Sequence, residues 1–394
     1  MNPGAAGGVS VAMPAAPPYD VAIVGLGPVG AALAAHLGQR GLRVLALEKE
    51  TVPYSLPRAA HLDGHALRAL AEAGVEAEGR PLDGFDLVDR RGRLLLRGRP
   101  KETPPPGFPS GLLIHQPTVE QALRQRLAER PNVEVCLGHA VERVDDAGDS
   151  VVLAGRGPEG PFRVRAALAV GCDGARSVVR ESVGAELRGG GFDQSWLVVD
   201  GLVRDAAARA ALPDRLLQIA DPVRPTTSVP FAPPRHRWEF KLGPADDAGA
   251  ARQPDAVRAR LAPHVDPGGV EVERAAVYTF HDLVADQWRR GRLVLAGDAA
   301  HQMPPFLGQG LGAGLRDVRA LAPRLAEVVR GARIDRIDAY EAERRPHVEA
   351  TIRQAVRLGR LVTLPEPWAT ARDRALRAAH RVGPLRRWLL DVRG

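Results

Sequence analysis

Three glycines near the start of the chain have the spacing of a turn that binds a dinucleotide. Gly25, Gly27 and Gly30 form the pattern G-x-G-x-x-G, directly after the apolar run 20–24 and directly before a helical pattern over 31–40. The first glycine allows a tight turn, the second lets a pyrophosphate approach the backbone, and the third allows the helix to pack closely on the strand. The helix N-terminus adds partial positive charge for the phosphates. The pattern predicts a site for NAD or FAD.

A carboxylate follows at the distance that such a site requires. Residues 42–47 form a second predicted strand, and Glu48 stands at its end. There a carboxylate can accept a hydrogen bond from a ribose hydroxyl, and it disfavours a 2′-phosphate. The strand, the helix, the second strand and the acid together favour dinucleotide binding over an ordinary glycine-rich turn, but they do not separate NAD from FAD.

Two longer segments carry a resemblance to a known family. Residues 170–180 read VGCDGARSVVR, and residues 291–317 read GRLVLAGDAAHQMPPFLGQGLGAGLRD. They resemble the DG and GD motifs of the single-component FAD-dependent aromatic hydroxylases, the p-hydroxybenzoate hydroxylase-like flavoprotein monooxygenases. The likeness runs from about Asp20 to about Val362. It implies that the bound dinucleotide is FAD.

The resemblance also implies which residues hold FAD. Arg58 matches a family position that reaches the pyrophosphate and the substrate cavity, and Gln116 matches a flavin contact. Asp298 can accept a hydrogen bond from a ribityl hydroxyl. The glycine-rich loop after it can present backbone N–H groups and a helix N-terminus to the flavin pyrimidine, which stabilises negative charge on reduced flavin. The expected FAD contacts are Gly25, Gly27, Gly30, Glu48, Arg58, Gln116, Asp173, Gly174, Gly297, Asp298, Gly308, Gly310, Leu311 and Gly312. His301 is expected to pack or cap, without a role in proton transfer.

The activity implied by the resemblance is hydroxylation of a phenolic ring with NAD(P)H and O2. NADH or NADPH binds transiently and reduces FAD, O2 forms a C4a-hydroperoxide, and the electron-rich arene attacks its distal oxygen. Because the cofactor carries this chemistry, no side chain is assigned as catalytic, and the protein binds, orients and excludes water. The substrate is expected between the flavin and a strand-rich insertion, against Thr226, Ser228, Arg237, Trp238, Pro304 and Pro305.

Several stretches, among them 56–64 and 340–347, look closest to the 3-(3-hydroxyphenyl)propionate hydroxylase branch, with three departures. Gly312 stands where relatives commonly have Asn, and Pro323 predicts that its helix ends or kinks there. The 394 residues leave no room for the C-terminal thioredoxin-like domain that longer relatives append. This shorter frame favours a tailoring enzyme of secondary metabolism, so phenylpropionate-type and secondary-metabolite substrates both stay open.

The elements that must position these residues predict an α/β fold. We expect a Rossmann-like FAD-binding domain of the glutathione-reductase type, with an inserted substrate domain built on a mixed β-sheet and a helical C-terminus. The predicted boundaries are a disordered leader over 1–18, a discontinuous FAD-binding domain over 19–83, 110–183 and 278–330, a substrate domain over 84–109 and 184–277, and a helical segment over 331–394.

The composition argues against nucleic acid, a metal ion or a membrane as a partner. The chain has 54 Lys and Arg against 47 Asp and Glu, a net charge of +7, but nearly all of the cations are scattered arginines, which disfavours nucleic acid as a partner. Two distant cysteines form neither a disulfide framework nor a metal site, which is typical of a reducing cytosol. No run is long enough to span a membrane. We therefore expect a cytoplasmic monomer or homodimer with no metal and no membrane partner.

Other flavin-dependent activities predict different sequence features. An FAD-dependent halogenase predicts a Trp-x-Trp-x-Ile-Pro segment, and the five tryptophans show no such pairing. A flavin-dependent oxidoreductase that inserts no oxygen stays open, as does a non-catalytic flavin- or NAD-binding protein. The choice between NADH and NADPH also stays open, because the family has no second Rossmann domain.

Overall fold

The computed structural model describes residues 19–82, 84–98 and 103–381, and its largest sheet has eight strands. The central strand β1 (Tyr19–Val24) pairs in parallel with β2 (Val44–Glu48) on one side and with β11 (Gly160–Gly171) on the other. Residues 21–23 are fully buried, as a central parallel strand requires. The other strands of this sheet are β8 (Val133–Leu137), β9 (Ala140–Asp146), β10 (Val151–Gly157), β19 (Arg289–Arg290) and β20 (Leu293–Leu295).

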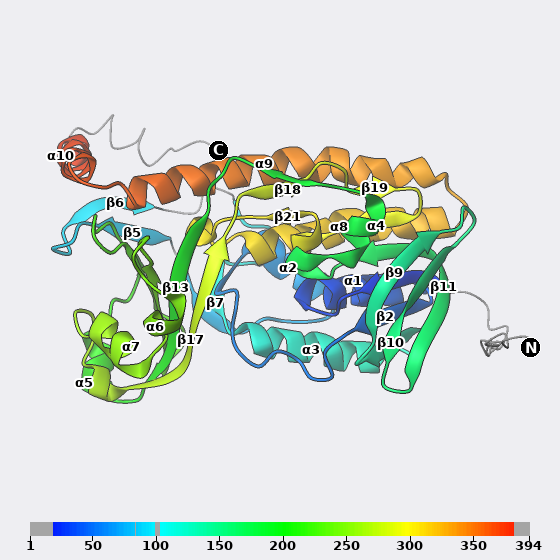
Figure 1. The fold of residues 1–394 in the computed structure, drawn as a ribbon, viewed down its shortest axis with the longest axis horizontal. Coiled ribbons are helices and arrows are strands. Elements are labelled where there is room, and N and C mark those ends of the chain that lie inside the picture. Colours follow the sequence, from blue (N-terminus) through cyan, green and yellow to red (C-terminus); the bar gives the residue numbers. More distant parts are fainter. Residues whose placement is uncertain (1–18, 83, 99–102, 382–394) are drawn as a thin grey trace, which may run out of the picture.

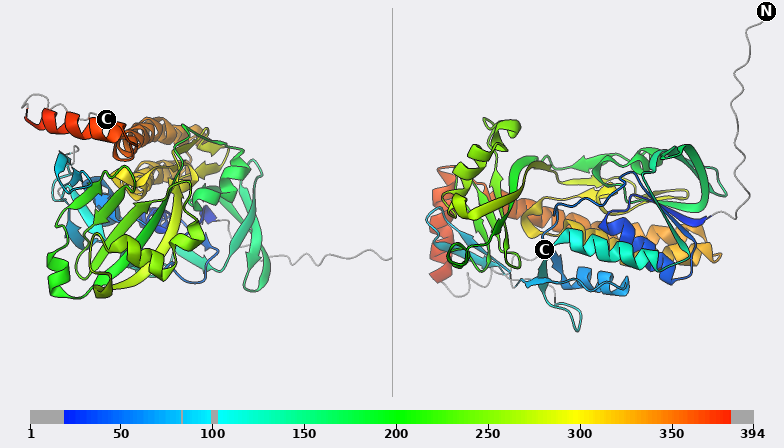
Figure 2. Two further views of the ribbon diagram at one scale, coloured as in Figure 1. Left: turned by 60° about the vertical axis from the view of Figure 1, so that its left-hand side comes forward. Right: turned by 90° about the horizontal axis from the view of Figure 1, so that it is seen from below.

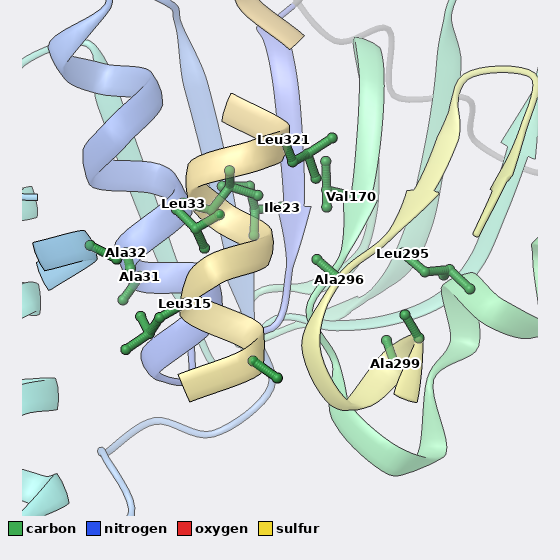
Figure 3. Close-up of a cluster of buried hydrophobic side chains, with 14 of the residues drawn as sticks. Ile23, Ala31, Ala32, Leu33, Val170, Leu295, Ala296, Ala299, Leu315 and Leu321 are labelled. Carbon is green, nitrogen blue, oxygen red and sulfur yellow. The ribbon is translucent and has the colours of Figure 1, made fainter. Parts of the chain in front are cut away.

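Helices α1 (Pro28–Gln39) and α8 (Gly310–Val329) pack together against this sheet. Leu33 of α1 and Leu315 and Leu321 of α8 lie in one apolar cluster with Ile23 and Val170 of the sheet (Figure 3). Further helices are α2 (Gly64–Glu72), α3 (Gln116–Ala128), α4 (Val178–Val183), α9 (Asp338–Val362) and α10 (Trp368–Arg381). The long helix α9 runs along the molecule above α8 (Figure 1).

A seven-stranded sheet lies at one end of the molecule, beside the larger sheet (Figures 1 and 2). Its order is β17 (Val270–Phe280), β13 (Gln194–Val203), β16 (Arg235–Lys241), β15 (Thr226–Val229), β14 (Leu216–Ile219), β5 (Phe85–Val88) and β6 (Leu94–Gly98). Helix α7 (Pro254–Leu261) packs on the outer face, where Trp238 and Phe240 are fully buried. Two further short helices are α5 (Ala206–Ala210) and α6 (Ala248–Ala251). Because strand residues alternate, the neighbours of Trp238 face the other way, toward the larger sheet.

Two small sheets and several single turns of 3-10 helix join the larger elements. One sheet has the order β3 (His61–Asp63), β7 (Gly111–Ile114) and β4 (Gly79–Pro81); the other has β12 (Leu187–Gly189), β18 (Leu283–Ala285) and β21 (His301–Gln302). The turns are η1 (Gly174–Arg176), η2 (Pro267–Gly269), η3 (Gly297–Ala299), η4 (Pro305–Leu307) and η5 (Ile334–Ile337).

The predicted α/β class and the first β-α-β unit are confirmed, and one of the two outcomes expected at Pro323, the end of the helix, does not occur. Helix α8 does not end at Pro323 but continues to Val329, because buried leucines on both sides of the proline hold it in the apolar core. The predicted leader over 1–18 and the last residues of the predicted helical segment, 382–394, lie outside the described residues. Within the described part of the chain, no helix is long and apolar enough to cross a membrane.

Candidate active site

A cavity of about 1690 Å³ is lined by residues of both the eight-stranded and the seven-stranded sheets. The turn between β1 and α1 lines it, and the helices α1 and α8 both begin on its wall. The inner face of the seven-stranded sheet, which carries Arg237 and Glu239, lines it as well. The cavity therefore brings the predicted cofactor motifs and the strand-rich insertion to one space.

The β1–α1 turn has the geometry that its three glycines predict. Gly25 has φ +93°, a left-handed conformation that favours glycine, and it lines the cavity with Gly27. A Cβ added at Gly27 would meet no heavy atom within 4 Å, so its backbone faces open space. Gly30 does not line the cavity; a Cβ there would lie 2.0 Å from the carbonyl oxygen of Gly25. Gly27 thus leaves room for a ligand, and Gly30 allows helix packing.

Glu48 lies at the carboxyl end of β2 and lines the cavity beside this turn. Its Oε2 accepts a hydrogen bond of 2.7 Å from the backbone N–H of Leu26, and its Oε1 accepts one of 3.0 Å from the N–H of Glu50. These bonds hold the turn and the strand end together. Each carboxylate oxygen can accept a further bond from a ligand.

Gln116 connects helix α3 with the loop that carries Arg58. The backbone N–H of Ala59 donates to its Oε1 at 2.5 Å, and its Nε2 donates to Glu120 at 2.6 Å. Arg58 is exposed on the cavity wall, and its guanidinium carbon lies 4.9 Å from the centre of the Tyr54 ring. Gln116 therefore fixes the loop, and Arg58 presents a cation to the cavity.

The DG segment lines the cavity at the end of β11. Asp173 accepts hydrogen bonds from Ser177 Oγ at 2.5 Å and from the backbone N–H of Val178 at 2.8 Å, so it also orders the start of α4. Burial raises the pKa of Asp173, although these hydrogen bonds oppose the shift. Gly174 follows with φ +76° and lies on the cavity wall.

Asp298, in the GD segment, projects into the cavity without a partner. Its side chain is open to the cavity and makes no hydrogen bond within the described part of the chain. Burial raises the pKa of Asp298, with His301 and Arg58 opposing the shift. Gly297 lies beneath the wall with φ +62° and packs near Val29. An unpaired carboxylate on the cavity wall fits a ligand that supplies hydroxyl donors.

A buried ionic cluster under this segment holds it in place. Asp317 of α8 accepts a hydrogen bond of 3.2 Å from the backbone N–H of Gly297 and lies 2.6 Å from Nε2 of His301. Arg344 of α9 donates to the other oxygen of Asp317 at 2.9 Å. Burial opposes ionisation, but His301 and Arg344 hold the pKa of Asp317 below its usual range. Asp317 and Arg344 were not among the residues predicted from the sequence.

The glycine-rich loop brings the N-terminus of α8 to the cavity. Gly308, with φ +63°, lines the wall together with Gly310 and Leu311. Gly312 lies behind the wall, where a Cβ would stand 3.3 Å from Oε1 of Gln309 and 3.5 Å from a carboxylate oxygen of Asp63. The partial positive charge of a long helix therefore points into the cavity.

On the seven-stranded sheet, the side chains that line the cavity are mostly the strand neighbours of those predicted, one position along the chain. Thr226, Ser228 and Trp238 face away from the cavity and are buried on the outer side of the sheet. Of the predicted set, the residues that line the cavity are Arg237 and Pro305, whereas Pro304 does not. The alternation of the strands instead presents Val198, Gln218, Thr227, Val229, Arg237, Glu239, Arg274 and Tyr278. A one-residue change of register moves every side chain to the other face.

Arg237 is held in place rather than free to meet a ligand. Its Nε donates to Asp200 at 2.7 Å, and its Nη atoms donate to the backbone carbonyls of Arg58 at 2.8 Å and Pro57 at 2.9 Å. Arg274 also pairs with Asp200, at 2.8 Å, and donates to the hydroxyl of Tyr278 at 2.9 Å. This cluster connects the sheet to the loop that carries Arg58.

Glu239 of the sheet and Tyr54 of the loop after β2, which both line the cavity, have altered acidity. Burial raises the pKa of Glu239, and Arg237 opposes the shift. Burial disfavours ionisation of Tyr54 as well, but hydrogen bonds with Tyr278 and Arg274 hold the pKa of Tyr54 below its usual range. Within the residues that the structure describes, no group of three or more His, Cys, Asp or Glu side chains could hold a metal ion.

The residues present fit bound FAD. Open space beyond Gly27, an unpaired Asp298 and two helix N-termini on one wall match the pyrophosphate, the ribityl hydroxyls and the anionic edge of the flavin in turn. Of the expected contacts, Gly30, Gly297 and Gly312 shape the wall from behind, and the others line it.

Comparison with known proteins agrees with this geometry. Residues 18–355 match a family model described as an FAD binding domain. The chain is 40% identical over 372 residues to a probable NADH-specific resorcinol 4-hydroxylase from Rhodococcus jostii (strain RHA1), covering 92% of this chain and 69% of the relative. It is 36% identical over 381 residues to a 3-(3-hydroxy-phenyl)propionate/3-hydroxycinnamic acid hydroxylase from Mycolicibacterium smegmatis, covering 95% of this chain and 67% of the relative.

A solved structure shows the same fold. The crystal structure of p-nitrophenol 4-monooxygenase from Pseudomonas putida DLL-E4 superposes with a TM-score of 0.84 at 28% identity, covering 95% of this chain and 96% of that one.

Proposed function

The chain belongs to the FAD-dependent aromatic hydroxylases, and we propose that it uses NADH and O2 to hydroxylate a small phenol held between FAD and the seven-stranded sheet. It is a flavoprotein monooxygenase with a nicotinamide co-substrate. NADH is the proposed donor because the resorcinol hydroxylase relative is named as NADH-specific. The observation that carries the proposal is a single cavity that joins the cofactor motifs to the sheet wall.

The FAD-binding residues have separate roles in this proposal. Gly27 and the N-terminus of α1 would receive the pyrophosphate, with Arg58 as the countercharge, and Glu48 would accept a ribose hydroxyl. Asp298 would accept the ribityl hydroxyls. The N-terminus of α8 would place partial positive charge at the edge of the flavin that becomes anionic on reduction.

Bound FAD supplies the redox chemistry, taking reducing equivalents from NADH and transferring one oxygen atom from O2 to the ring. The protein's contribution is to bind, orient and dry the reactants. Apolar side chains from both parts of the molecule line the same cavity: Val198, Leu216, Val229, Phe280, Met303, Phe306 and Leu307. They exclude water around the reacting atoms, which favours oxygen transfer over release of peroxide.

The relatives suggest two substrate classes. One relative is named for resorcinol, a neutral ring with two hydroxyls, and the other for 3-(3-hydroxy-phenyl)propionate, which adds a carboxylate side chain. Both are small phenols that match the expected electron-rich arene. The proposal covers this shared class.

A coupled assay tests the proposed function. Purified protein should retain FAD and show its two-banded absorbance, and phenols should accelerate NADH oxidation and yield products one oxygen atom heavier by mass spectrometry. Phenols that raise only the output of peroxide would instead indicate an oxidoreductase without oxygen insertion. A colourless protein that takes up no FAD would indicate a non-catalytic role.

A further inference from the structure

Glu239 is an acid on the cavity wall without a hydrogen-bond partner. It lies on β16 between Trp238 and Phe240, which both face outward, so its side chain faces the cavity. That side chain keeps 12% of its exposure, and its nearest ion-pair contact is Nη1 of Arg237 at 3.8 Å. Within the described residues its carboxylate accepts no hydrogen bond. It is therefore an acceptor available to a ligand.

The two arginines beside Glu239 are already engaged. Arg237 and Arg274 both pair with Asp200, at 2.7 Å and 2.8 Å. Arg237 also donates to two backbone carbonyls at 2.8 and 2.9 Å, and Arg274 donates to Tyr278 at 2.9 Å. With two arginines and two acids, the cluster has no net positive charge to offer. A ligand carboxylate at this wall would face Glu239 without a free guanidinium to offset it.

The neighbours of Glu239 present groups that bind hydroxyls. Thr227 stands directly opposite Glu239 in the strand register and donates its hydroxyl to Oε1 of Gln218 at 3.0 Å. That bond orients Gln218 and leaves its amide nitrogen as a donor on the cavity wall. Tyr278 adds a hydroxyl that accepts from Arg274 and also hydrogen-bonds with Tyr54. One strong acceptor and several neutral partners suit a ring that carries more than one hydroxyl.

We propose that Glu239 selects a neutral arene with at least two hydroxyl groups, such as a 1,3-dihydroxybenzene, over a phenol with a carboxylate side chain. The Glu239 carboxylate accepts a hydrogen bond from one substrate hydroxyl, and Gln218 or Tyr278 meets the other. A hydrogen bond to a charged group is stronger than a neutral one, and a substrate carboxylate at the same place would be repelled. This inference rests on the proposed function, because it assigns the substrate class of the same cavity.

Titration of the flavin absorbance of the FAD-bound protein tests the proposal. The probes are 1,3-dihydroxybenzene, phenol and 3-(3-hydroxyphenyl)propionate. We expect 1,3-dihydroxybenzene to bind the unaltered protein most tightly. Glu239→Gln should weaken it by about 10-fold or more, as the loss of a charged hydrogen bond predicts, and should tighten the carboxylate-bearing phenol. Glu271→Gln removes an exposed acid from β17 of the same sheet and should change neither value.

The outcomes separate this inference from the proposed function. If no phenol perturbs the flavin spectrum of the unaltered protein, the proposed function is wrong. If phenols bind but Glu239→Gln and Glu271→Gln give the same affinities, only the role of Glu239 is wrong. If the unaltered protein binds 3-(3-hydroxyphenyl)propionate more tightly than 1,3-dihydroxybenzene, the selective role of Glu239 is also wrong. Arg58 would then be the residue that meets the substrate carboxylate. Should Glu239→Gln not fold, Glu239→Asp decides: the preference for 1,3-dihydroxybenzene must persist, because the charge remains.

Discussion

A methyl group added at Gly27 would enter the cavity without touching the protein. No heavy atom lies within 4 Å of its position, and the backbone there has φ −66°, which alanine adopts without strain. Gly27→Ala should therefore leave the stability of the FAD-free protein unchanged or raise it by about 0.4–1 kcal/mol, because alanine restricts the unfolded chain. Its methyl group would occupy the space through which a pyrophosphate approaches the backbone.

The expected effect on FAD is large by comparison. Losing one backbone hydrogen bond to a charged phosphate costs about 1.5–3 kcal/mol, which raises Kd by about 10- to 150-fold. Fluorescence quenching during titration of FAD-free protein measures Kd, and thermal unfolding of the same sample measures stability. A Kd within twofold of the unaltered value would refute the placement of the pyrophosphate.

Gly30→Ala is the matched contrast. Its Cβ would lie 2.0 Å from the carbonyl oxygen of Gly25 and 3.2 Å from Cβ of Cys172, so the backbone must move. Such overpacking costs about 1–3 kcal/mol. We expect the FAD-free Gly30→Ala protein to unfold at lower temperature, whereas Gly27→Ala should not. Equal melting temperatures for the two variants would contradict the separate roles of these glycines.

Two further predictions concern the GD segment. Asp298→Ala should raise the Kd for FAD by about tenfold or more through the loss of an acceptor, without lowering the Tm of the FAD-free protein, because the carboxylate has no partner in the described chain; an unchanged flavin content after dialysis would argue against this contact. His301 and Arg344 hold the pKa of Asp317 in the folded protein below its usual range. The stabilisation from this ionised pair is therefore present above about pH 4 and is lost as pH falls through the folded-state pKa. Urea unfolding at pH 3 to 7 measures the free energy of unfolding. Near neutrality Asp317→Asn should be about 3–5 kcal/mol less stable than the unaltered protein, and this difference should narrow toward pH 3. A difference that does not change with pH would contradict the ionised pair.

The cofactor end of the site could be predicted from the sequence because its signals are local. The turn at 25–30 and the acid at position 48 belong to one β-α-β unit, and their spacing along the chain fixes their geometry. The segments at 170–180 and 291–317 likewise carry their own turns. The sequence could not decide whether α8 ends at Pro323, because the buried face of the helix, set by tertiary packing, overrides the local preference of proline.

The substrate wall could not be predicted at residue level because it depends on which face of a strand meets which neighbour. The apolar Trp238 and Phe240 suggest a buried face, but the sequence does not say that helix α7 covers it and that the cavity lies behind Glu239. The strand register decides this, and a shift of one residue exchanges the two faces. The ionic cluster at Asp317 was missed for a similar reason, since it joins segments distant in sequence.

The most direct test of the assigned activity is the fate of oxygen during turnover. Purified FAD-bound protein is supplied with NADH, 1,3-dihydroxybenzene and ¹⁸O₂, and the labelled product is compared with the NADH consumed. We predict that the product contains one atom of ¹⁸O, in an amount that approaches the NADH oxidised. Unlabelled product, or NADH oxidation that yields only labelled peroxide with every phenol tested, would contradict the assignment of this protein as an aromatic hydroxylase.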